Sequence, residues 1–99
     1  MMDYPEERRT VFASTTGGVM TDEAGAVTGE LELSCRPDAD LLHVLVRYAG
    51  AEEWYTVSGS PVRSRRDSAG SQRGVIEHLR TPGPIVDGNE KPVSLEGFF

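Results

Sequence analysis

Residues 29–35 read Gly-Glu-Leu-Glu-Leu-Ser-Cys, and this stretch decides the fold class. Its leucines and its cysteine alternate with glutamates and a serine, and a two-residue period is typical of a β-strand with one buried face. Two further β-prone segments follow at residues 41–48 and 53–58. We therefore predict three consecutive strands that form an antiparallel meander.

The turn between the first two of these strands is expected at residues 36–40, where a proline and two aspartates supply turn chemistry. The register that best matches the apolar faces places Cys35 opposite Leu42, and it pairs Glu30 with Arg47. The core face predicted from this register consists of Leu31, Leu33, Cys35, Leu42, Val44, Val46, Tyr48, Tyr55 and Val57.

The opposite face of the meander is less polar than a solvated face needs to be. Leu41, Leu45 and Trp54 lie on it, with His43 and Arg47 at their edge. An apolar patch with a polar rim is typical of a contact surface, so we predict that these five residues bind a partner. The alternative is that the first strand, the N-terminal loop or the C-terminal tail covers the patch.

The rest of the chain predicts one helix and shorter strands. A first strand is expected at residues 10–14, and residues 85–86 and 93–96 resemble a hairpin with a long turn. A helix is expected from Ser71, as N-cap, to Arg80. Its apolar stripe consists of Val75, Ile76 and Leu79.

These elements predict an α+β fold. We expect one small domain over residues 1–99, with an antiparallel sheet of about four to six strands and one short helix packed on one face. Residues 1–9 and 62–71 are expected to be flexible, since the first lacks an apolar pattern and the second is rich in Ser, Arg and Gly.

Composition excludes several classes of protein. The single cysteine excludes a disulfide scaffold and fits a reducing cytoplasm. No apolar run is long enough for a membrane span, and the N-terminus has no secretory signal. A net charge of −6 argues against a general nucleic-acid coat. Nine arginines against the single Lys91, with abundant Gly and Ala, indicate a GC-rich bacterial genome.

Positive charge is concentrated in one segment. Residues 1–57 hold four Arg and eleven Asp or Glu, hence −7, whereas residues 58–80 hold five Arg and two acids, hence +3. Ahead of a helix N-terminus, such a segment is a candidate anion site. The candidates are Arg63, Arg65, Arg66 and Arg73. The alternative is a solvated loop, and Ser68 within it matches a basophilic kinase site.

Candidate catalytic groups are few. Cys35 is expected in the core and His43 on the opposite face, so they do not form a nucleophilic dyad. His78 is expected to be solvated. The spacing of these residues fits no zinc site, and residues 87–90 fit a turn better than a calcium loop. No catalytic, metal or cofactor residue is therefore predicted.

The sequence favours a small non-catalytic interaction or regulatory protein that acts through the Trp54 face, with homodimerisation as the simplest version. One alternative is a binding domain for an anionic metabolite, or a small enzyme, that uses residues 63–73. A second is nucleic-acid binding by the same arginines, with Trp54 or Tyr55 as a stacking platform.

Overall fold

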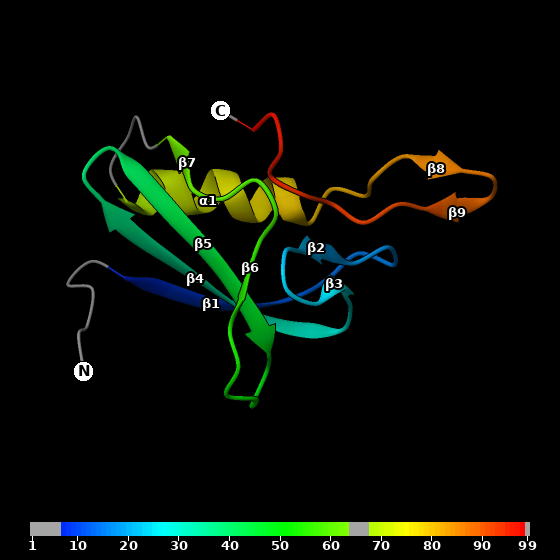
Figure 1. Cartoon of the computed structure of the whole chain (residues 1–99), viewed down its shortest axis with the longest axis horizontal. Helices are drawn as coiled ribbons and strands as arrows, with labels where there is room; N and C mark the ends of the chain where they lie inside the picture. The colour runs from blue at the N-terminus through cyan, green and yellow to red at the C-terminus, as the bar shows by residue number, and fades with distance from the viewer. Residues whose placement is uncertain (1–6, 64–67, 99) are drawn as a thin grey trace.

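The alternating segment forms the central strand of the main sheet. The computed structural model describes residues 7–63 and 68–98. The strands of the main sheet are β1 (Arg8–Ala13), β4 (Glu30–Asp38), β5 (Leu41–Tyr48), β6 (Tyr55–Thr56) and β7 (Val62–Arg63). The order is β1-β4-β5-β6, with β7 also paired to β5, and all pairs are antiparallel (Figure 1).

One helix, α1 (Ser68–Leu79), packs against β1 and β4 on one face of this sheet. Val75 and Leu79 are fully buried there and Ile76 packs against the core, which confirms the predicted apolar stripe. The helix begins at Ser68 rather than at the predicted Ser71. The predicted fold class, an antiparallel sheet with one helix on one face, is confirmed.

The core lies between the sheet and the helix. Leu31, Leu33 and Val46 are fully buried, as the alternation predicts. The complete set of buried apolar residues is Phe12, Val19, Val27, Leu31, Leu33, Cys35, Leu42, Val44, Val46, Val57, Val62, Val75, Leu79, Val93 and Leu95. Tyr48 does not belong to it, because its place at the end of β5 leaves it 43% exposed, and Tyr55 is only partly buried.

The predicted turn at residues 36–40 is wrong, because β4 continues through Pro37 to Asp38. The turn is the two-residue step at Ala39 and Asp40, and Ala39 has a positive φ of 56°. The register is therefore Cys35 opposite Val44 and Pro37 opposite Leu42, shifted by two residues from the prediction. A register shift of two residues leaves every side chain on the same face of the sheet, so the residues predicted to face the core still do so.

Pro37 is tolerated within β4 because successive residues of a strand direct their N–H groups to opposite neighbouring strands. Ala49 N donates to Glu30 O at 3.0 Å, so the even-numbered residues of β4 bond towards β5. The missing N–H of Pro37 lies on the other side, beyond the start of β1. No bond of the β4–β5 ladder is lost there, which is the position a proline needs in a strand.

Two small hairpins flank the main sheet: β2 (Val19–Thr21) with β3 (Gly25–Val27), and β8 (Ile85–Val86) with β9 (Asn89–Glu90). The second is tighter than predicted, since Asp87 and Gly88 both have positive φ and make a short turn. Val93 instead bridges to Val19. The β8–β9 hairpin projects from the body of the molecule (Figure 1).

Part of each segment expected to be flexible lies in regular structure. Residues 62–63 form β7, residues 68–71 begin α1, and β1 starts at Arg8. Residues 1–6 and 64–67 lie outside the described residues, and the flexibility itself stays a prediction. Within the described part of the chain, no helix has the length and apolar character to cross a bilayer.

Candidate functional site

The face of the main sheet opposite α1 is called the outer face here. Its members alternate along the strands with the core residues, and the five predicted partner-binding residues all lie on it. The outer face includes Glu7, Arg9, Val11, Glu32, Ser34, Arg36, Leu41, His43, Leu45, Arg47, Trp54 and Thr56. α1 packs on the other face of the sheet. At the β6 end the turn between β2 and β3 reaches the outer face, where Glu23 accepts from Thr56 N at 2.6 Å and from the Thr56 hydroxyl at 2.8 Å.

Trp54 is the centre of the outer face. Three guanidinium carbons lie near the centroid of its ring, that of Arg47 at 4.4 Å, that of Arg9 at 5.4 Å and that of Arg36 at 5.5 Å. These three arginines come from three different strands. The ring therefore lies across the sheet rather than pointing away from it, and it is half-buried. The first strand, one of the predicted covers, lies beside β4 within the sheet and not over Trp54. Residues 1–6 lie outside the described residues, so cover by the N-terminal loop stays a prediction.

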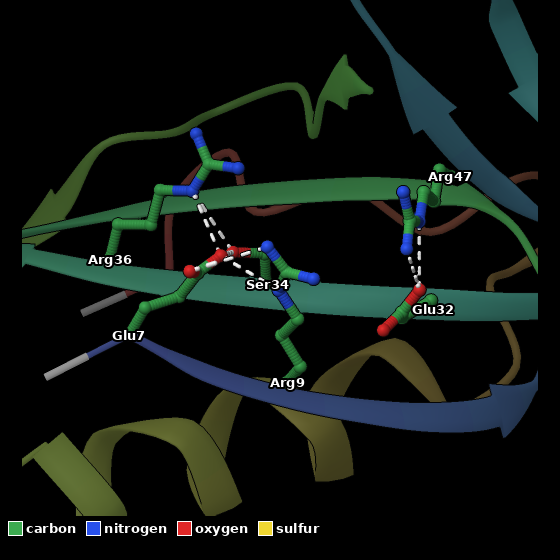
Figure 2. A network of polar contacts seen from close by, with 6 residues as sticks. All are labelled: Glu7, Arg9, Glu32, Ser34, Arg36 and Arg47. Carbon is green, nitrogen blue, oxygen red and sulfur yellow. Dashed lines mark hydrogen bonds and ion pairs between the residues drawn. The ribbon is translucent and has the colours of Figure 1, made fainter. Parts of the chain in front are cut away.

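A carboxylate holds two of these arginines in place. Arg9 Nε donates to Glu7 Oε2 at 3.1 Å, and Arg36 Nε donates to the same oxygen at 3.2 Å (Figure 2). The Ser34 hydroxyl donates to this oxygen as well and accepts from Arg36 Nε at 3.0 Å. Ser34 is fully buried although it lies on the outer face.

This network stabilises the charged form of Glu7. Burial acts to raise the pKa of its carboxyl group, but the hydrogen bonds from Ser34, Arg9 and Arg36 outweigh that effect. The pKa of Glu7 therefore lies below its ordinary value of 4.5.

A second carboxylate holds the third arginine. Arg47 donates to Glu32 Oε1 at 2.7 Å across the β4–β5 pair (Figure 2). The predicted pair of Arg47 with Glu30 is wrong, because the register shift of two residues brings Glu32 opposite Arg47 instead. The side chains of the pair are only 22% and 18% exposed, so the ion pair is better shielded than an ordinary surface pair.

The other predicted members of this face are less central. His43 Nε2 lies 3.3 Å from Asp38 Oδ2, at the turn end of β5. Leu41 and Leu45 are partly buried. The sequence reasoning missed Glu7, Arg9 and Arg36, because residues 1–9 were expected to be flexible and Arg36 was placed in a turn.

The arginines of the basic segment do not form a site among the described residues. Arg63 is exposed and lies 3.7 Å from Asp40, and Arg73 is exposed on α1. Arg65 and Arg66 lie outside the described residues, and the structure describes nothing of the Ser68 side chain. The anion-binding and phosphorylation hypotheses for this segment stay predictions.

A pocket of about 280 Å³ lies between the end of α1 and the C-terminal segment. Its lining residues are His78, Thr81, Pro82, Gly83, Pro84, Pro92, Val93 and Ser94. His78 Nε2 lies 2.7 Å from Ser94 O and its ring lies 5.0 Å from that of Phe98. The prediction that His78 is solvated is wrong, because the C-terminal segment folds back over the helix. None of the predicted anion-binding arginines lines this pocket.

The structure keeps the remaining candidate catalytic groups apart. Cys35 is buried in the core, and burial raises the pKa of its thiol to about 12, which leaves it protonated and unreactive. His43 lies on the opposite face of the sheet. Within residues 7–63 and 68–98, no three His, Cys, Asp or Glu side chains are grouped as a metal site would require.

The fold and the site therefore define a small α+β protein with an arginine-flanked tryptophan at the centre of the sheet face opposite its helix. Comparison with protein-family models, curated proteins and solved structures finds no match for this chain.

Proposed function

We propose that this chain is a non-catalytic recognition module that docks a partner protein on its outer face, with Trp54 at the centre of the contact. The observation that carries the proposal is the half-buried Trp54 ring with three guanidinium groups within 5.5 Å, on the face of the sheet opposite α1. Trp and Arg are the residue types that contribute most to protein interfaces.

The geometry supports a surface that is ordered before it binds. Glu7 holds Arg9 and Arg36, Glu32 holds Arg47, and all three arginines flank Trp54. Side chains that are already fixed lose little conformational entropy on association. A surface of this kind binds more tightly than a flexible one of the same composition.

Charge favours a partner with exposed carboxylates. The cluster around Trp54 holds three arginines and two glutamates, hence +1, whereas the whole chain carries −6 and its remainder therefore −7. Arginine binds carboxylates through two parallel hydrogen bonds. A second copy docked on this face would bring two arginine clusters together, so we favour an acidic partner over the homodimer expected from the sequence.

We also propose that the protein acts in the cytoplasm. Cys35 is the single cysteine of the chain, and it is buried and unpaired. This use of cysteine is the one expected in the reducing cytoplasm.

Trp54 is the only tryptophan, so its fluorescence tests the proposal directly. We expect a polyglutamate peptide to change the emission of Trp54 saturably at low ionic strength, and the effect to weaken as salt is added. The variant Arg36→Gln should weaken this binding by about tenfold, the loss of one charge-assisted hydrogen bond. Arg73→Gln, which removes an exposed arginine from α1, is the matched control and should leave the titration unchanged.

Three results would contradict the proposal. A polyglutamate titration that leaves the emission of Trp54 unchanged would contradict the proposal of an acidic partner. A response only to a single-stranded oligonucleotide of equal charge would favour the nucleic-acid alternative. Loss of binding in Arg73→Gln but not in Arg36→Gln would move the site to the basic segment.

A further inference from the structure

The free edge of the main sheet is a second surface, distinct from the outer face. β1 is the last strand on its side, and among the described residues no strand pairs with its outer edge (Figure 1). Ser14 N donates to Gly29 O at 2.9 Å and continues the β1–β4 ladder. Even-numbered residues of β1 therefore bond to β4, and the N–H and C=O groups of Arg9, Val11 and Ala13 point to the open edge.

The second half of this edge lacks the usual protection against strand pairing. Natural edge strands are guarded by charges, prolines or bulges. β1 carries its two arginines at its start, and residues 10–13 are uncharged. Val11 is 54% exposed, which makes it one of the most exposed large apolar side chains that the structure describes.

We propose that β1 pairs antiparallel with β1 of a second copy of this chain, about a twofold axis at Val11. Two opposite residues of an antiparallel pair both direct their N–H and C=O groups towards the partner strand, or both direct them away from it. An odd-numbered residue of β1 therefore lies opposite an odd-numbered residue of the second copy, and the twofold axis passes through a residue and not between two residues. An axis at Val11 places the two Val11 side chains opposite each other and Arg9 opposite Ala13 of the second copy. An axis at Thr10 would place the two Arg9 side chains diagonally adjacent, and one at Arg9 would place them directly opposite.

Like charges opposite each other destabilise a strand pair, whereas two β-branched side chains stabilise it. Of these three axes, the one at Val11 is therefore the register that the side chains of β1 favour. It joins two sheets into one and keeps both outer faces on the same side, because paired residues of antiparallel strands point to the same face. The inference goes beyond the proposed function, since it uses the strand edge and not the Trp54 cluster.

Solution mass by light scattering over a hundredfold range of concentration tests this pairing. We expect the wild-type mass to rise from the monomer value of 10.8 kDa towards twice that value. Val11→Lys should raise the dissociation constant at least about tenfold, because it sets two ammonium groups opposite each other. Val86→Lys, at a valine 43% exposed on the β8–β9 hairpin, is the matched control and should dimerise like the wild type.

A cysteine variant tests the register itself. Val11→Cys should form a disulfide-linked dimer under mild oxidation, whereas Arg9→Cys should not, because the two positions 9 lie four residues apart in the proposed register. Cys35 is buried and should give no crosslink in the wild type. A wild type that stays monomeric, or a dimer that survives Val11→Lys and dissociates with Trp54→Ala, would overturn the proposal.

Discussion

The Arg47 guanidinium carbon lies 4.4 Å from the centroid of the Trp54 ring, and the same side chain donates to Glu32 at 2.7 Å. Arg47 is therefore held from two sides, by the π-face of an aromatic ring and by a carboxylate on the neighbouring strand. The ion pair that fixes Arg47 therefore also fixes the position of the Trp54 ring on the outer face.

We expect the contact between Arg47 and Trp54 to stabilise the fold measurably. A cation–π pair contributes about 0.5–1 kcal/mol at an exposed site and about 2 kcal/mol when desolvated, so we expect about 1–2 kcal/mol for this partly buried pair. A double-mutant cycle with Arg47→Met and Trp54→Leu, read by chemical denaturation, should give a coupling free energy of that size. A coupling indistinguishable from zero would mean that the two side chains are close but do not depend on each other.

Glu7 should make the stability of the protein depend on acid pH. Its folded-state pKa is lowered by the bonds from Ser34, Arg9 and Arg36, which outweigh burial, so its stabilising effect is present above the ordinary pKa of 4.5. That effect is lost as the pH falls through the lowered pKa. We expect Glu7→Gln to cost about 1–2 kcal/mol at pH 7 and to flatten the decline in the free energy of unfolding on the acid side.

The control for Glu7 is Glu30→Gln, which removes the same charge from an exposed position on β4. Urea denaturation at a series of pH values compares the two variants with the wild type. A decline of equal slope in the wild type and in Glu7→Gln would show that the carboxylate network does not form.

The turn between β4 and β5 should be improved by glycine. Ala39 has a φ of 56°, a conformation that costs an L-residue roughly 1–2 kcal/mol and costs glycine almost nothing. Part of this gain is offset by the greater freedom of glycine in the unfolded chain. Ala39→Gly should therefore raise the free energy of unfolding by about 0.5–1 kcal/mol, measured by denaturation. Lower stability would contradict the observed turn.

The turn at Ala39 and Asp40 also explains why the buried faces were predicted correctly from the sequence and the strand register was not. The alternation of residues 29–35 and 41–48 determined which side chains are buried, because the faces depend only on the two-residue period. The register depended on finding the turn, and Ala39 gives no turn signal whereas Pro37 gives a strong one. The prediction therefore assigned each side chain of β4 and β5 to the correct face, but the predicted pairs of opposite residues differ from the observed ones by two residues.

The candidate site was predictable only in part for the same reason. Trp54 and Arg47 follow from the alternation of the meander. Arg9 and Glu7 reach the outer face only because β1 pairs with β4, and that long-range pairing has no local signal in a short segment with two charges. The position of Arg36 depended on the misplaced turn.

Quenching of Trp54 fluorescence by iodide and by caesium tests the central claim most directly. The claim is that the one tryptophan of an acidic chain lies in an accessible, positively charged environment. We predict that iodide quenches Trp54 more strongly than caesium at low ionic strength, and that salt or Arg36→Gln reduces the difference. Stronger quenching by caesium, or no quenching by either ion, would contradict the account.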